Sequence, residues 1–349
     1  MFWNGSLYRK PKARRGGSER ACGGARSGPC AREGRSGAGA PVPPAGLVGV
    51  RGMKDQDCVA LLQWALPRLD MRWAGFRKVR RQVCRRIGAR MEALGLASTQ
   101  AYRQHLEERP EEWEVLDEFC RITISRFFRD LTVWSWLRDS ALPDLATRAR
   151  HLGRPVRCWS VGCASGEEPY SLILVWRLGV SRRFPDVSLE VLATDADAHM
   201  LNRAERACYP AASLREVPEA WTDLAFVPSG SEMCLREPFR TGIELRQGDV
   251  RASMPEGPFD LILCRNLAFT YFDLPVQRRV LEGLTDRLVE GGRLVLGSHE
   301  RLPDGSWPLV PDDTTLPVHR RTGSVGGAIA APITPEPNAS RREEPARWT

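Results

Sequence analysis

The hydrophobic pattern changes along the chain from a helical one to one in which strands and helices alternate. In the first part, hydrophobic residues at three- and four-residue steps predict an amphipathic helix over 76–94. Capping residues at 98–99 and Pro110 predict two further helices, the second of which ends near Cys120. The segment up to about residue 140 is therefore expected to be all-helical.

From about residue 154, short β-rich runs alternate with helical ones. Strands are predicted over 156–161, 188–193, 259–264 and 293–297, and helices over 171–178, up to about 207, and over 274–290. Such alternation is typical of an α/β fold in which a parallel sheet has helices on both faces and binds its ligand beyond the carboxyl ends of the strands. After the sheet, 307–310 and 317–321 are expected to form an antiparallel hairpin.

The net charge of +8 is concentrated in one segment. Residues 1–52 hold ten lysines and arginines against two acidic residues, whereas the rest of the chain has 41 of each. The segment also holds twelve of the 31 glycines and has no periodic hydrophobic pattern, so it is expected to be disordered. We interpret it as an extension upstream of a start at Met53; the alternative is a tail that binds nucleic acid or an acidic surface.

The ten cysteines and five histidines do not predict a metal site, because the cysteines include no C-x-x-C pair and the histidines are scattered singly. In a long chain without a hydrophobic secretory segment, the cysteines are expected to be reduced, which predicts a cytoplasmic protein. No hydrophobic run approaches the ~18 residues that a membrane span needs. Membrane insertion is therefore not expected.

Small and acidic residues follow the first two predicted strands. Gly162 and Gly166 bracket the turn after the first strand, where a backbone without side chains can approach a ligand. The turn lacks the Lys-Ser/Thr of a phosphate-binding loop and the third glycine of the dinucleotide fingerprint. Asp195 ends the second strand, where a carboxylate can accept hydrogen bonds from ribose hydroxyls or, alternatively, cap the next helix. This combination predicts an adenosyl cofactor without phosphate, and S-adenosylmethionine fits.

Longer motifs occur in a fixed order along the chain. They are Ile122-Thr-Ile-Ser-Arg-Phe-Phe-Arg-Asp130, Trp159-Ser-Val-Gly-Cys-Ala-Ser-Gly-Glu-Glu-Pro-Tyr-Ser171, Ala193-Thr-Asp-Ala-Asp197, Cys264-Arg-Asn266 with Tyr271-Phe-Asp273, and Gly291-Gly-Arg-Leu-Val-Leu-Gly-Ser-His-Glu300. Together they resemble the CheR-type chemotaxis methyltransferases over about residues 57–321. The resemblance implies a class I (Rossmann-like) methyltransferase sheet with a small all-helical N-terminal domain. It also implies methyl transfer from S-adenosylmethionine to glutamate side chains of chemoreceptors.

The resemblance further implies a set of cofactor-binding residues. By position, these are Thr123, Ser125 and Arg129 facing the cofactor, Gly162, Glu167 and Glu168 at the cofactor loop, Asp195 at the ribose, Asp249 and Val250 beside adenine, and Asn266 and Leu267 at the methionine end. Two of the implied residues are catalytic candidates. Arg129 would hold the methionine carboxylate or steer an acidic side chain, the alternative being a structural salt bridge. Tyr271 would lie near the transferred methyl group, the alternative being a core tyrosine.

Some stretches depart from the family pattern. The segment from Asn266 to Tyr271 contains one residue more than usual, and Gly297-Ser-His-Glu300 replaces Gly-His-Ser-Glu. In the stretch 208–242, where the family inserts a small β-subdomain that can hold a receptor tail, strand alternation is unclear, so tail binding is not predicted. These departures concern substrate recognition more than the cofactor.

Seven basic residues lie between Arg77 and Arg90 without an acidic one. They form either a solvated helix face or a docking surface for an acidic helical partner, such as a chemoreceptor-like protein. Two other functions stay open: methyl transfer to RNA or a small molecule, and a catalytically silent signalling module that binds the cofactor. The predicted organisation is a disordered extension over 1–52, a helical domain over 53–140, a methyltransferase domain over 141–322 and a disordered tail over 323–349.

Overall fold

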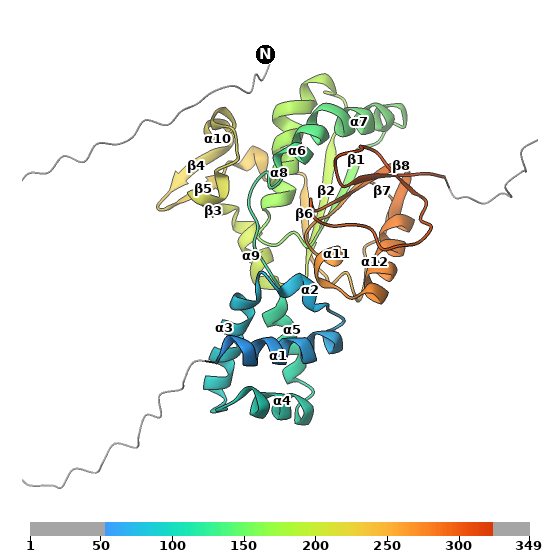
Figure 1. The fold of residues 1–349 in the computed structure, drawn as a ribbon. Helices are drawn as coiled ribbons and strands as arrows, with labels where there is room; N and C mark the ends of the chain where they lie inside the picture. Colours follow the sequence, from blue (N-terminus) through green and yellow to red (C-terminus); the bar gives the residue numbers. More distant parts are fainter. Residues whose placement is uncertain (1–52, 324–349) are drawn as a thin grey trace, which may run out of the picture. The chain divides into compact units, whose positions relative to one another are not determined.

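A computed structural model of the chain describes residues 53–323 (Figure 1). The predicted extension over 1–52 and the tail from residue 324 onward lie outside the described residues. No helix within 53–323 is long and apolar enough to cross a lipid bilayer.

The described chain begins with helices, drawn in blue and blue-green in Figure 1. They are α1 (Asp55–Ala65), η1 (Leu66–Leu69), α2 (Trp73–Phe76), α3 (Arg80–Ala93), α4 (Thr99–Glu108) and α5 (Glu112–Cys120). The predicted cap is confirmed, because the Ser98 side chain accepts a hydrogen bond from the amide of Ala101 at 3.1 Å. The helix predicted over 76–94 starts later, at Arg80, because residues 77–79 form a turn after α2.

Hydrophobic residues of these helices form one core. Leu62, Val83, Ile87 and Leu106 are at most 1% exposed and pack in the same cluster. Burial of each such side chain stabilises the fold by about 1.5–3 kcal/mol. The three- and four-residue spacing in the sequence therefore marks the buried face of α3, as predicted.

After these helices, the chain forms a seven-stranded sheet in the order β6-β2-β1-β7-β8-β10-β9. Its strands are β1 (Val156–Val161), β2 (Leu189–Asp195), β6 (Ile243–Gln247), β7 (Phe259–Cys264), β8 (Leu288–Leu296), β9 (Leu309–Pro311) and β10 (Val318–Arg321). The first five strands in this order are parallel, whereas β10 and β9 form the predicted antiparallel hairpin. The carboxyl ends of the parallel strands therefore meet at one edge of the sheet.

Helices cover both faces of the sheet. They are α6 (Leu131–Trp136), η2 (Leu137–Ala141), α7 (Leu142–His151), α8 (Glu167–Val175), η3 (Trp176–Val180), η4 (Ser181–Arg183), α9 (Ala198–Arg206), α11 (Ala268–Tyr271) and α12 (Leu274–Arg287). Successive residues of β1 point to opposite faces: Cys158 joins the core of α6, α7 and α8, and Trp159 joins the core that includes α12. The prediction that the last long helix reaches residue 290 is wrong, because Leu288 already pairs with Phe259 in the sheet.

A second, smaller sheet lies within residues 208–242, where the sequence shows no clear strand alternation. The strands β3 (Cys208–Pro210), β5 (Glu232–Leu235) and β4 (Phe226–Ser229) form an antiparallel sheet beside η5 (Ala211–Leu214), α10 (Glu219–Ala225) and η6 (Glu237–Phe239). These strands are only three or four residues long. Such short strands show too few alternations to be recognised from sequence. The stretch 208–242 therefore holds a small antiparallel sheet, and the expectation that it does not bind a receptor tail stays a prediction.

Two disulfides overturn the prediction that the cysteines are reduced. Cys58 of α1 is bonded to Cys84 of α3, and Cys208 of β3 is bonded to Cys234, its partner in β5. Packing of α1 on α3, and the register of β3 with β5, bring these residues together. Cysteine spacing alone cannot reveal such contacts. Four other described cysteines are free and buried, namely Cys120, Cys158, Cys163 and Cys264. Cysteine chemistry therefore does not support the predicted compartment.

Candidate functional site

Two neighbouring cavities lie at the carboxyl edge of the parallel strands. The first lies between the sheet and the helical region before it, and the second is lined by the segment 122–129 and by residues of the sheet edge. The cavities share wall residues, namely Ile122, Gly162, Ala164 and Asn266. The two spaces are therefore adjacent parts of one site.

Most of the predicted site residues line these cavities. Thr123, Gly162, Asp195, Asp249, Val250, Asn266, Leu267 and Tyr271 line the first, and Ser125, Arg129, Gly162, Glu168 and Asn266 line the second. Glu167 lines neither cavity: it is 3% exposed and its carboxylate accepts a hydrogen bond from the Ser165 hydroxyl at 2.9 Å. The structure thus brings all of them together except Glu167.

Gly162 lies where the two cavities meet. Its φ of +71° is in the left-handed region, and a Cβ atom there would lie 2.6 Å from Cδ2 of Leu267. Its amide donates to the Thr194 carbonyl at 2.8 Å, which ties the loop after β1 to the end of β2. Only glycine therefore fits this backbone without displacing the opposite wall.

Asp195 presents a partly satisfied carboxylate to the first cavity. Its two oxygens accept one amide each, from Ala164 at 2.8 Å and from Asp197 at 2.9 Å. Burial raises the pKa of this carboxyl, and the two amides only partly oppose the effect. A carboxylate oxygen can accept more than one hydrogen bond, so acceptor positions remain for a ligand. The alternative role as helix cap falls to Asp197, which accepts from the amides of His199 and Met200.

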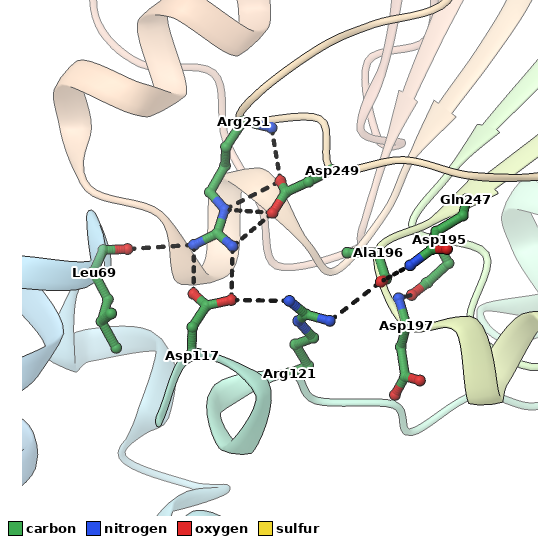
Figure 2. A network of polar contacts seen from close by, with 9 residues as sticks. All are labelled: Leu69, Asp117, Arg121, Asp195, Ala196, Asp197, Gln247, Asp249 and Arg251. Atoms are coloured by element: carbon green, nitrogen blue, oxygen red, sulfur yellow. Dashed lines mark hydrogen bonds and ion pairs between the residues drawn. The ribbon is translucent and has the colours of Figure 1, made fainter. Parts of the chain in front are cut away.

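An ion-pair network closes the first cavity beside Asp249 (Figure 2). Arg251 donates to the carboxylate of Asp249 at 2.6 Å and to both oxygens of Asp117, on α5, at 2.7 and 2.9 Å. Arg121 donates to Asp117 at 3.2 Å and to the carbonyl of Ala196 at 3.2 Å. Burial favours the neutral form of Asp249, but its hydrogen bonds and attraction to Arg251 outweigh this, so the pKa is lowered. The network joins the helices to the strand ends.

The second cavity contains a guanidinium group without a carboxylate partner. Arg129 donates to the Ile124 carbonyl at 3.2 Å and forms no ion pair with any carboxylate of residues 53–323. The buried Arg265 is different, because it pairs with Asp130 at 2.8 Å and with Glu168 at 3.2 Å. Arg129 is thus available to an anionic ligand group, whereas Arg265 holds the cavity wall.

Tyr271 lies in the wall of the first cavity and packs against Phe76, with ring centroids 5.1 Å apart. Burial raises the pKa of its phenol, so the hydroxyl is neutral at physiological pH. The ring therefore packs against the helical core and also borders the first cavity, and its place near the transferred methyl group stays a prediction.

The sequence analysis missed several residues of the site. Met71, Cys120 and Arg121 line the first cavity but come from the helical region before the sheet, where no local motif marks a ligand site. Arg265 and Glu300 do lie inside recognised motifs, next to Asn266 and at the end of the glycine-rich stretch. Motif membership was therefore an available signal for these two.

The residues present fit S-adenosylmethionine. Asp195 supplies acceptors for ribose hydroxyls, Gly162 permits close approach of the backbone, and Arg129 can bind a carboxylate. Among residues 53–323, no group of three or more His, Cys, Asp or Glu side chains is arranged to hold a metal ion.

Comparisons with known proteins point to the same chemistry. The family described as "CheR methyltransferase, SAM binding domain" matches residues 123–310, and "CheR methyltransferase, all-alpha domain" matches residues 78–118. A chemotaxis protein methyltransferase of Listeria monocytogenes is 34% identical over 191 residues, which is 54% of this chain and 70% of that protein. Chemotaxis protein methyltransferase 2 of Pseudomonas aeruginosa is 30% identical over 229 residues, which is 63% of this chain and 78% of that protein.

Proposed function

The chain belongs to the CheR family of S-adenosylmethionine-dependent methyltransferases, and we propose that it methylates glutamate side chains of a chemoreceptor-like protein. The family match confirms the predicted family, fold class and cofactor. The glutamate acceptor and the role of each residue are our proposal. The observation that carries it is Arg129, which lines the second cavity and pairs with no carboxylate of residues 53–323.

The first cavity would hold the adenosine half of the cofactor. Asp195 would accept hydrogen bonds from the ribose hydroxyls, and Asp249 and Val250 would flank adenine. The Arg251 network keeps the Asp249 carboxylate in a fixed position. Asn266 and Leu267 would line the methionine end, close to Gly162.

S-adenosylmethionine, when bound, supplies an electrophilic methyl group on a positively charged sulfur. A glutamate carboxylate is ionised at neutral pH, with an ordinary pKa of about 4.3, so its attack needs no general base. An oxygen–carbon bond forms, the sulfur–carbon bond breaks, and no proton is transferred. The protein therefore has to position the acceptor, and Arg129 would either steer the incoming carboxylate or hold the carboxylate of the methionine end.

The basic surface formed by α3 and the turn before it would suit an acidic partner. Three of its seven basic residues are used inside the protein: Arg80 binds Asp55, Arg86 donates to two carbonyls, and Arg90 binds Glu112. The other four, Arg77, Lys78, Arg81 and Arg85, are exposed. An exposed cluster of one sign attracts an oppositely charged protein surface and accelerates association.

The proposal is tested by the chemistry of the transferred methyl group. We expect the purified protein, incubated with S-adenosylmethionine carrying a labelled methyl group and with cell extract, to label a protein band. Mild base should release that label as methanol, because an ester hydrolyses where a methylated amine or nucleobase does not. Base-stable label, or label in RNA, would refute the glutamate acceptor but not the methyltransferase family.

Charge reversal tests the docking surface. The double change Arg81→Glu and Arg85→Glu should raise the KM for the labelled acceptor and alter its salt dependence, with unchanged affinity for S-adenosylhomocysteine. The matched control is Arg278→Glu with Arg279→Glu, two exposed arginines on α12 that line neither cavity. Equal effects of both double changes would refute the docking surface.

A further inference from the structure

The loop between β7 and α11 is held by a single buried carboxylate. Glu300 is 5% exposed and lies after β8, 34 residues from Asn266 in sequence. Its Oε2 accepts from the amides of Asn266 and Gly297, each at 2.7 Å. Its Oε1 accepts from the Leu267 amide at 3.1 Å and from the Thr270 hydroxyl at 2.7 Å. Four donors therefore occupy the acceptor positions of this carboxylate.

No lysine, arginine or histidine among residues 53–323 forms an ion pair with Glu300. A buried charge without a cation is costly unless hydrogen bonds replace its water. Here the donors are three amides and one hydroxyl, and three of the four belong to the segment 266–270, which is this loop and the start of α11. The arrangement thus couples burial of the carboxylate to one conformation of that loop.

The loop requires such support because its backbone is unusual. Asn266 has a φ of +58°, in the left-handed region, which is strained for a residue other than glycine. Leu267, with φ −131° and ψ −94°, precedes the single turn of α11 and provides no side-chain cap for it. Glu300 accepts hydrogen bonds from the backbone amides of both residues. Without the carboxylate, they would be left without these hydrogen bonds at the cavity wall.

The same loop shapes the place where the cavities meet. Asn266 lines both cavities, and Leu267 lies opposite Gly162, with Tyr271 at the end of the turn. Gly297 has no room for a side chain, since a Cβ atom there would lie 2.8 Å from Oε2 of Glu300. The two stretches that depart from the family pattern, from Asn266 to Tyr271 and Gly297-Ser-His-Glu300, are therefore in direct contact.

We propose that Glu300 is a positioning residue for methyl transfer, which holds Asn266 and Leu267 where the first and second cavities meet. It touches neither substrate and acts through the loop. The inference rests on the family's methyl-transfer activity and on the proposed place of the cofactor's methionine end beside Asn266 and Leu267. It does not depend on which molecule accepts the methyl group.

The test replaces Glu300 by glutamine, which keeps the shape but exchanges one acceptor oxygen for a donor. We expect Glu300→Gln to remain folded and to lose at least tenfold of the hydrogen-exchange protection in the segment 265–271, with protection of β1 unchanged. In an assay with methyl-labelled S-adenosylmethionine and the acceptor protein that receives the label, kcat should fall roughly 10- to 100-fold. A small misplacement of reacting groups has an effect of that size. The KM for the cofactor should change less than kcat.

Two further variants keep the test decisive. Thr270→Val removes one of the four hydrogen bonds and should change the same two measurements in the same direction, but less. Glu282→Gln, an exposed glutamate on α12, is the matched control and should change neither. If Glu300→Gln does not fold, Thr270→Val decides alone.

Unchanged exchange over 265–271, or an unchanged kcat in folded Glu300→Gln, would overturn the proposal. A lower melting temperature with kcat and KM intact would also overturn it, since that result assigns Glu300 a structural role only. If the wild-type protein labels no acceptor, the proposed acceptor fails. The exchange experiment, repeated with and without S-adenosylhomocysteine, still decides whether Glu300 holds the loop.

Discussion

Replacement of Arg251 by methionine is expected to destabilise the protein in a way that depends on pH. Methionine keeps most of the side chain's length but leaves the carboxylates of Asp117 and Asp249 without their shared guanidinium group. Removal of one partner from a buried ion pair costs about 3–5 kcal/mol. The side chains of Arg251 and Asp117 are 17% and 13% exposed, so solvent screens part of this loss. We expect about 2–3 kcal/mol, or a melting temperature lower by roughly 4–12 °C.

The pH dependence follows from the lowered pKa of Asp249. A carboxyl group with a lowered pKa contributes its stability above the unfolded value, about 3.9, and loses it as the pH falls through the folded value. The difference between wild type and Arg251→Met should therefore be complete at pH 7 and smaller below about pH 4. Differential scanning calorimetry at both pH values measures it.

The matched control is Arg246→Met, which removes an exposed pair with Glu244. Their side chains are 51% and 63% exposed, and such a pair contributes about 0–1 kcal/mol. The reasoning is refuted if Arg251→Met melts like this control, or if its deficit is the same at about pH 3.5 as at pH 7.

Other expected outcomes concern the cofactor cavity and the disulfides. Asp195→Ala should weaken S-adenosylhomocysteine binding by about 1–3 kcal/mol in calorimetry, and unchanged affinity in a folded variant contradicts the ribose role. Because the pKa of Asp195 is raised, the affinity of the wild type should begin to fall, as the pH is lowered, at a higher pH than it would with an ordinary aspartate. Gly162→Ala should reduce S-adenosylhomocysteine binding far more than Gly230→Ala, because Gly230 also has a positive φ but a Cβ atom there would meet no other atom within 4 Å. Equal effects would exclude the proposed close approach of the cofactor to the Gly162 backbone. Loss of the disulfide between Cys58 and Cys84, which are 26 residues apart, should lower the free energy of unfolding by up to about 3.5 kcal/mol. An unaltered midpoint of denaturant unfolding in the presence of reducing agent argues against this stabilisation.

Parts of the fold could be predicted because the relevant signal is local. Every residue of β7 (Phe259–Cys264) is buried, and a run in which five of six residues are hydrophobic indicates a central parallel strand. Gly162 directly follows β1 and Asp195 ends β2, and sheet topology then places them at one edge. The end of α12 was not predictable in this way, because pairing of Leu288 with β7 decides it.

The missed residues of the site depend on contacts between distant segments. Arg251 and Asp117 are 134 residues apart, and neither lies in a recognisable motif. Charge alone cannot say which of 51 basic residues meets which of 43 acidic ones. The same limit explains the basic surface, since a count of seven basic residues does not show that Arg80, Arg86 and Arg90 are already engaged.

The helical region before the sheet contributes both the exposed basic surface and, through Met71, Cys120 and Arg121, part of the first cavity. Under the proposed function, partner recognition and cofactor binding are therefore not modular in this protein. A chimaera that receives its helices from another methyltransferase would exchange part of the adenosine site along with the docking face. Mutations that adapt the helices to a new acceptor are thus constrained by the need to retain the cofactor. Acceptor preference can change more freely at Arg77, Lys78, Arg81 and Arg85, which line neither cavity.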